Sequence, residues 1–357
     1  MIVRIENRQL VHILVLFLIT QFGGLLLASL VFSTSPPVSA AVSGGSAINS
    51  TTQTLLYFGS ILLFALLLLF VIRVYKGELL FRLLEAFAVV STSFFFFLIL
   101  LGYFFPTADF IPIGVVSLAL AVGIILAKNR KPSLKNIVVV ISSIGLGVVL
   151  GLSFSFAAAF LFLLLIAIYD YVAVFVTKHM IVFAKALSER NLAFLITASD
   201  IEVESKSQMQ KEEGKEFKKH YSEMKKINNP TIQKLIHDGY VPVIAQIQLG
   251  AGDLGLPLMF AVSAYSVFAN YFLSVVIVAG SAIGLIATML FLMRYRRPLP
   301  AIPPIFAFIC IALGLALPFT PLSSLTLSAL LLAMGVFIIY VVMFLTLKMG
   351  EKSSKKA

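Results

Sequence analysis

The sequence predicts an all-α polytopic membrane protein with about nine to ten transmembrane helices. Of its 357 residues, 60% are hydrophobic and only 12% are charged, and the mean hydropathy is +1.04. A soluble domain carries roughly twice that charged fraction. Apolar runs of about 20 residues, the length that crosses a bilayer, recur from one end of the chain to the other.

Ten apolar runs follow one another along the chain and define the predicted helices. The first has about 23 residues, which exceeds the core of a signal peptide at about 7–15, so we interpret it as a retained helix. The seventh run is expected to be a helix whose start is loosened by Gly250 and Gly252. The runs cover about 10–32, 55–74, 83–105, 110–127, 136–152, 154–177, 241–268, 270–293, 300–318 and 324–347.

The charges between these runs predict the topology. Connections with basic residues alternate with connections that have none, which by the positive-inside rule places both termini and the long charged loop in the cytoplasm of a protein integral to the cell membrane. The net charge of +11 is therefore interpreted as a topology signal, and no nucleic-acid partner is expected. The single cysteine, Cys310, cannot form a disulfide framework or a cysteine metal site within one chain.

The predicted organisation has five parts. The long loop mixes both signs of charge and is expected to be solvated, partly helical and partly disordered. The parts are helices one to five at 1–153, helix six at 154–177, the cytoplasmic loop at 178–240, helices seven to nine at 241–318, and an extra C-terminal helix with a basic tail at 319–357.

Few ionisable residues fall within the apolar runs. Glu85 lies near the cytoplasmic end of the third run, close to Arg82, and is expected to be interfacial. Asp170, in "AIYDYVAVF", and Asp253, in "LGAGDLGLP", fall at similar depth toward the cytoplasmic side, in the sixth and seventh runs. An intramembrane carboxylate costs a few kcal/mol at least, so both aspartates are functional candidates.

Two carboxyl groups that face each other cannot both ionise cheaply, and such a pair shares a proton. In an aspartic protease the ionised group takes a proton from a water held between the two, while the protonated group polarises the scissile carbonyl. Intramembrane carboxylates also carry protons or cations in transporters. Spacing alone leaves both interpretations open and slightly favours a proton- or ion-coupled transporter.

Three short motifs change that balance. "YD" at Tyr169 and Asp170, "GAGD" at Gly250–Asp253 and "PAI" at Pro300–Ile302 occur in this order, near the ends of the sixth, seventh and ninth runs. This pattern resembles the presenilin and signal peptide peptidase family of GxGD intramembrane aspartyl proteases, in particular its archaeal branch. The resemblance covers roughly 155–318 and implies a presenilin-like fold. PAI replaces the family's PAL, the tenth run exceeds the family's usual nine helices, and the first five runs carry no family motif.

The resemblance implies that Asp170 and Asp253 are the catalytic pair. Tyr169 is expected to donate a hydrogen bond or to shape the pocket, or else to be an interfacial aromatic. Gly250 and Gly252 are expected to allow close backbone approach and non-helical dihedrals, or simply helix–helix packing.

The third motif is expected to position the substrate, with Pro300, Ala301 and Ile302 beside an extended stretch that nearby prolines keep from becoming helical. A transmembrane helix or signal peptide must be unwound before water can attack it, and its exposed backbone must then be paired, for example by strand addition. The prolines are Pro298, Pro300, Pro303 and Pro304.

The implied substrates are transmembrane proteins or signal peptides in the lipid bilayer, with no metal and no organic cofactor. Homo-oligomerisation is left open. The transporter alternative predicts inverted repeats with broken helices in both halves. No clear repeat is found, and both aspartates lie in the second half. A third alternative is an inactive relative that binds membrane proteins without cutting them.

Overall fold

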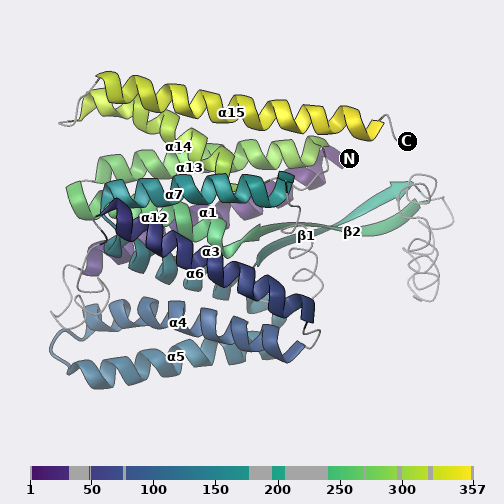
Figure 1. Ribbon diagram of the computed structural model, residues 1–357. Helices are drawn as coiled ribbons and strands as arrows, with labels where there is room; N and C mark the ends of the chain where they lie inside the picture. The colour runs from purple at the N-terminus through teal and green to yellow at the C-terminus, as the bar shows by residue number, and fades with distance from the viewer. Residues whose placement is uncertain are drawn as a thin grey trace. The chain divides into compact units, whose positions relative to one another are not determined.

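The computed structural model describes residues 2–31, 48, 50–74, 78–176, 195–205, 240–268, 271–295, 300–320 and 325–354. Among these residues there are ten α-helices (Figure 1). They are α1 (Ile2–Val31), α3 (Thr51–Val74), α4 (Glu78–Phe104), α5 (Phe110–Arg130), α6 (Lys135–Ser153), α7 (Phe156–Tyr171), α12 (Ala251–Phe268), α13 (Tyr271–Tyr295), α14 (Ile302–Ala316) and α15 (Leu325–Ser354).

Short elements complete the description. Two are single 3-10 turns, η1 (Pro132–Leu134) and η3 (Leu317–Phe319), and a π-helical turn, η2 (Val172–Val176), directly follows α7. The two strands β1 (Leu195–Ser205) and β2 (Tyr240–Gly250) pair in a two-stranded sheet.

The predicted all-α membrane fold is confirmed. Eight of the described helices are long and apolar enough to cross a membrane, and a ninth apolar stretch at Thr326–Val341 is shorter. Large apolar side chains such as Phe87, Ile111 and Phe319 are 76%, 76% and 84% exposed. Such exposure suits a surface that faces lipid.

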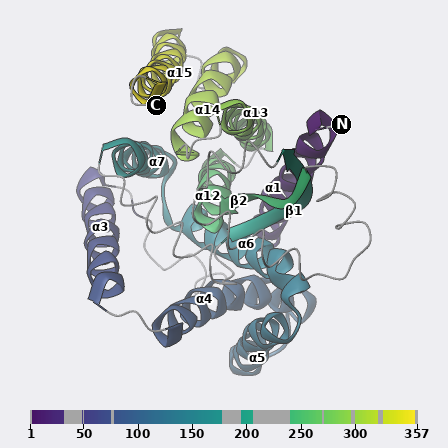
Figure 2. The ribbon, with the colours of Figure 1, turned by 90° about the vertical axis from the view of Figure 1, so that its right-hand side faces the viewer.

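The chain forms two compact units. One comprises Met1–Ile13 with Thr197–Gln248, and the other comprises Leu14–Ile196 with Leu249–Ala357. Within the second unit, α12 contacts α6, α7 and α13, while α14 contacts α7, α13 and α15 (Figure 2). The α12 side chains Leu258, Phe260 and Val262 are fully buried, so this helix lies in the core of its unit.

The expectation that the seventh apolar run is helical throughout is wrong. Tyr240–Gly250 is strand β2, and α12 begins only at Ala251. The physical reason is visible in "VIAQIQLG", where Gln246 and Gln248 alternate with Ile247 and Leu249 at the period of a strand. Strand β1 within the long loop has the same kind of alternation in "DIEVE" and was also not predicted. The rest of that loop lies outside the described residues.

Glu85, which was expected to be interfacial, is buried against other helices. Its side chain on α4 is buried and forms an ion pair with Lys128 of α5, whose side chain is equally buried. Lys135, the first residue of α6, also interacts electrostatically with Glu85. Because α4, α5 and α6 pack together, the charge of Glu85 meets its counter-charges between helices.

Candidate active site

Asp253 is the third residue of α12 and therefore lies in the first turn of that helix. Its Oδ2 accepts a hydrogen bond of 3.2 Å from the backbone N–H of Gly250. This is the reciprocal half of a capping box, in which a side chain in the first turn reaches back to the N–H of the capping residue. The positive end of the helix dipole also favours a negative charge at this position. The carboxylate of Asp253 thus stabilises the N-terminus of α12.

Asp170 is the penultimate residue of α7, and the π-helical turn begins two residues later. Its Oδ2 accepts a hydrogen bond of 3.3 Å from the backbone N–H of Ile302, and the Ala301 N–H interacts with the same carboxylate. Asp170 therefore caps the N-terminus of α14 from a different helix.

Because α14 begins with two prolines, the contact with Asp170 is enough to satisfy every free backbone N–H at the start of this helix. The first four N–H positions of a helix have no partner within it. In α14 two of these positions are Pro303 and Pro304, which have no N–H. The two that remain, on Ala301 and Ile302, are the two that meet Asp170. The PAI motif therefore binds the aspartate of the YD motif through its backbone N–H groups.

The two carboxylates lie close enough for their charges to interact. They come from α7 and α12, which are packed against each other, and both side chains are half-buried. Neither carboxylate has an ion pair with a cation among the residues that the structure describes. A pair of carboxyl groups in such surroundings shares a proton and can serve as a combined general acid and base.

The supporting residues lie around this pair. Tyr169 is half-buried and interacts electrostatically with the adjacent Asp170. A Cβ added to Gly250 would lie 3.1 Å from Asp253 Oδ2, so glycine leaves room for the carboxylate. A Cβ on Gly252 would meet nothing within 4 Å, and this residue is exposed. Gly250 ends strand β2 and is therefore non-helical as expected, whereas Gly252 lies within α12, and neither glycine has a positive φ.

The expected extended stretch at the third motif is wrong from Ala301 onward. Ala301 has helical dihedrals, φ −85° and ψ −37°, and α14 starts at Ile302 because prolines are tolerated in a first helical turn. Pro300 and Ile302 are buried and Ala301 is half-buried. Pro298 lies outside the described residues. The capping of α14 by Asp170 was missed, although two consecutive prolines at a helix start were a signal for it.

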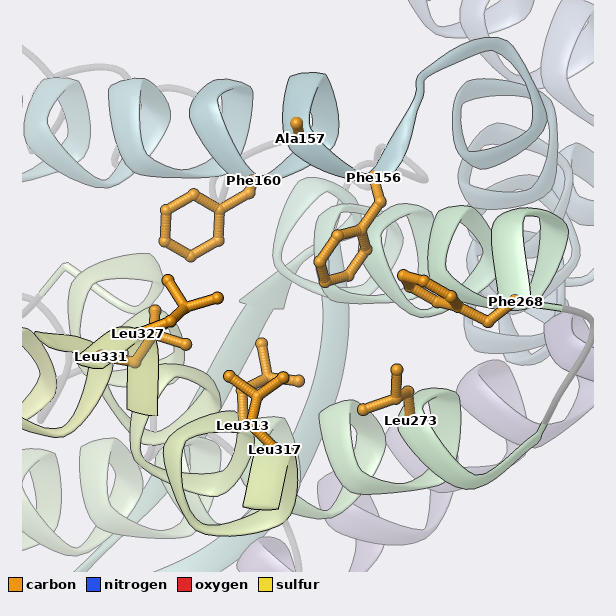
Figure 3. Close-up of a pocket in the computed structure, with 9 residues that line it drawn as sticks. All are labelled: Phe156, Ala157, Phe160, Phe268, Leu273, Leu313, Leu317, Leu327 and Leu331. Atoms are coloured by element: carbon orange, nitrogen blue, oxygen red, sulfur yellow. The ribbon is translucent and has the colours of Figure 1, made fainter. Parts of the chain in front are cut away.

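A separate cavity of about 350 Å³ lies away from the aspartates. Neither Asp170 nor Asp253 lines it, and its wall is almost entirely apolar. It lies between α7, α12, α13, α14 and α15, and Figure 3 shows phenylalanine and leucine side chains directed toward it. The lining residues are Phe156, Ala157, Phe160, Phe268, Leu273, Leu313, Leu317, Leu327 and Leu331.

Known proteins resemble this chain in sequence and in fold. A family model described as "Signal-peptide peptidase, presenilin aspartyl protease" matches residues 14–313. A solved structure of a presenilin family intramembrane aspartate protease in a C222 crystal is similar, with a TM-score of 0.55 and 20% identity over 87% of this chain and 99% of that one. A second, in a P2 crystal, has a TM-score of 0.52 and 19% identity over 86% and 96% of the two chains. No curated protein matches the chain significantly.

Proposed function

The chain belongs to the signal-peptide peptidase and presenilin family of aspartyl proteases, and on that premise we propose that Asp170 and Asp253 are its catalytic pair. The family match makes the protein an intramembrane aspartyl protease whose substrates lie within the bilayer, and it gives no support to the transporter alternative. The single observation that carries the residue assignment is the interaction of the two carboxylates across the packed helices α7 and α12.

The reaction uses the two carboxyl groups and one water. The ionised member of the pair removes a proton from water as the water oxygen attacks the scissile carbonyl carbon. The protonated member donates its proton to the carbonyl oxygen, which gives a neutral gem-diol. The diol collapses and its C–N bond breaks as the newly protonated carboxyl group gives its proton to the amine leaving group, while the ionised carboxylate takes a proton from one diol hydroxyl. The dyad then returns to its starting state with one shared proton.

The surrounding residues are assigned by what they touch. Gly250 donates its N–H to Asp253 and leaves space for that carboxylate, while Tyr169 lies beside Asp170. The exposed Gly252 gives an unwound substrate backbone a place to approach the dyad. In the third motif, Pro300 and Ile302 are buried supports of the helix start. Ala301 is the half-buried member, and we assign contact with the substrate to it.

The proposed topology follows from the distribution of basic residues between the helices. The N-terminus and the loop at 178–240 lie in the cytoplasm, so water reaches the aspartates from that side of the cell membrane. Transmembrane proteins and signal peptides are the expected substrates. Limited proteolysis of sealed vesicles tests the topology. A protease added to the cytoplasmic face should cut the 178–240 loop, and a protease added to the opposite face should not. The mass of the detergent-solubilised particle tests homo-oligomerisation.

Incubation of the purified protein with a single-span reporter, followed by mass spectrometry of the products, tests the catalytic assignment. Asp170→Asn and Asp253→Asn are expected to abolish cleavage while the protein stays folded. Asp109→Asn is the matched control, because Asp109 is exposed and makes no capping hydrogen bond to α5. Cleavage that survives in both active-site variants would refute the assignment.

A further inference from the structure

Helix α12 is weakened at the residue that carries the reactive group. Pro257 lies inside this helix and has no N–H, so the backbone carbonyl of Asp253, four residues earlier, has no helical donor. A proline ring also pushes against the carbonyl four residues before it. The first turn of α12 is therefore less firmly tied to the rest of the helix than an ordinary first turn, and other groups must fix its position.

One such group comes from α1. The side chain of Gln21 is fully buried, and its Nε2 donates a hydrogen bond of 2.9 Å to the backbone carbonyl of Leu254. Leu254 directly follows Asp253 and is itself fully buried. Because a carbonyl can only accept, this contact fixes which end of the amide faces α12. Close packing supports the contact, since a Cβ on Gly24 would overlap the side chain of Leu258.

A second group comes from α6. Ser143 Oγ donates a hydrogen bond of 3.3 Å to the backbone carbonyl of Ala251, the first residue of α12. The hydrogen bonds from Gln21 and Ser143 thus reach the backbone on either side of Asp253, one residue after it and two residues before it. Two neighbouring helices hold the turn that the proline loosens.

The oxygen of the Gln21 amide lowers the stability of the fold. Gln21 Oε1 is buried and has no hydrogen-bond partner among the described residues. A buried acceptor without a partner destabilises a fold, and an apolar side chain of the same length would avoid the cost. A methionine would fill this space with less penalty. The amide therefore contributes something other than stability.

We propose that Gln21 is a positioning residue for Asp253: its amide holds the Leu254 carbonyl and thereby orients the turn that presents the reactive carboxyl group. Ser143 assists from the other side. The inference rests on the proposed catalytic role of Asp253 and adds to it a residue about 230 positions away in the sequence, on the first helix, where no motif was recognised.

The test compares Gln21→Met with wild type in the reporter assay. We expect kcat to fall about tenfold, because a loosened turn misplaces the carboxyl group, and KM to stay within about twofold. The affinity of a transition-state analogue of aspartic proteases should fall by the same factor as kcat. The thermal midpoint should be unchanged or higher, which a merely structural role would not produce.

Thr20→Val is the matched control. Thr20 is the preceding residue, is also fully buried, and donates its hydroxyl to Leu16 of its own helix. The substitution therefore removes a buried hydrogen bond of α1 that does not reach α12, and kcat should not change. Equal kcat for Gln21→Met and wild type, with Asp253→Asn inactive, would overturn the positioning role and leave the protease function intact. Wild type that neither cleaves the reporter nor binds the analogue would overturn the proposed function and this inference with it.

A second pair of variants keeps the inference testable if Gln21→Met does not fold. Ser143→Ala should lower kcat by a few-fold in the same direction. Ser142→Ala should not, because Ser142 is buried but donates to Val139 within its own helix. Indistinguishable kcat values for the two serine variants would contradict the anchoring of α12 by its neighbours.

Discussion

Asp253 combines two roles that are usually separate. Its carboxylate closes the start of α12 through the Gly250 N–H, and the same carboxylate interacts with Asp170. The helix dipole and the backbone donor offset part of the cost of an acid within the membrane-spanning segment. The fold thus keeps the carboxylate in the first turn of the helix and does not bury it in the middle of the helix.

The two glycines of the GxGD motif are predicted to differ when each is replaced by alanine. Gly250→Ala places a Cβ 3.1 Å from Asp253 Oδ2, so the carboxylate must shift by a few tenths of an ångström. We expect kcat to fall about tenfold. Gly252→Ala meets nothing within 4 Å and removes a helical glycine, so we expect a gain of up to about 1 kcal/mol in stability. Because the substrate backbone is proposed to pass Gly252, KM should rise while kcat stays close to wild type.

Steady-state cleavage of the reporter and thermal unfolding of the same preparations provide both comparisons. Each variant is the control for the other, since both add one methyl group at neighbouring positions of the same motif. A larger loss of kcat in Gly252→Ala than in Gly250→Ala would contradict the assignment of Gly250 to the carboxylate.

At the scale of the element, helix ends and helix pairs carry the polar interactions. Helix α14 begins with two prolines and directs its two remaining orphan N–H groups to Asp170. Helices α4 and α5 bring Glu85 and Lys128 together in a buried ion pair. In both cases a polar group that is costly in an apolar environment is satisfied by a different helix, so the relative position of the two helices becomes specific.

The ion pair between α4 and α5 gives a prediction on stability. Lys128→Met leaves the buried Glu85 with less compensation, although Lys135 still interacts with it, and should lower the free energy of unfolding by about 3 kcal/mol. The double variant Glu85→Leu with Lys128→Met removes both charges and should be close to wild type. Unfolding in an SDS titration measures the stability of the single and the double variant. The control is Lys131→Met: Lys131 is exposed and directly follows α5, so its substitution should change stability by less than about 0.5 kcal/mol. A double variant clearly less stable than wild type would contradict this prediction and show that the pair itself is stabilising.

For the molecule as a whole, hydropathy and three motifs were enough to predict the membrane fold and the family, because both depend on local signals. The runs of apolar residues mark helices one by one, and the motifs lie next to the residues that they identify. The strand before Asp253 was missed because its apolar content resembled that of a helix, although its alternation was visible. The contact between Gln21 and Leu254 could not be predicted, because it depends on which faces of two distant helices meet.

The apolar cavity is another feature that only the assembled helices create. Side chains from five helices and the turn η3 line its volume of about 350 Å³, and Ala157 of α7 is its smallest lining residue. Ala157 and Leu327 are exposed, so the cavity opens at the surface of the helices, and apolar atoms that fill it gain contacts with its apolar wall, which is stabilising. We predict that Ala157→Leu raises the free energy of unfolding by about 0.5–2 kcal/mol.

The control for this prediction is Ala119→Leu on α5, which adds the same atoms at an exposed helical position that does not line the cavity and should leave stability nearly unchanged. Because neither aspartate lines the cavity, kcat of Ala157→Leu should stay within about twofold of wild type. A loss of stability in Ala157→Leu would mean that the space is already occupied in the membrane, since an added side chain would then compete with whatever apolar group fills it. Thermal unfolding in detergent and in lipid nanodiscs separates these cases: an empty cavity gives the same gain in both, and a lipid-filled cavity gives a gain only in detergent.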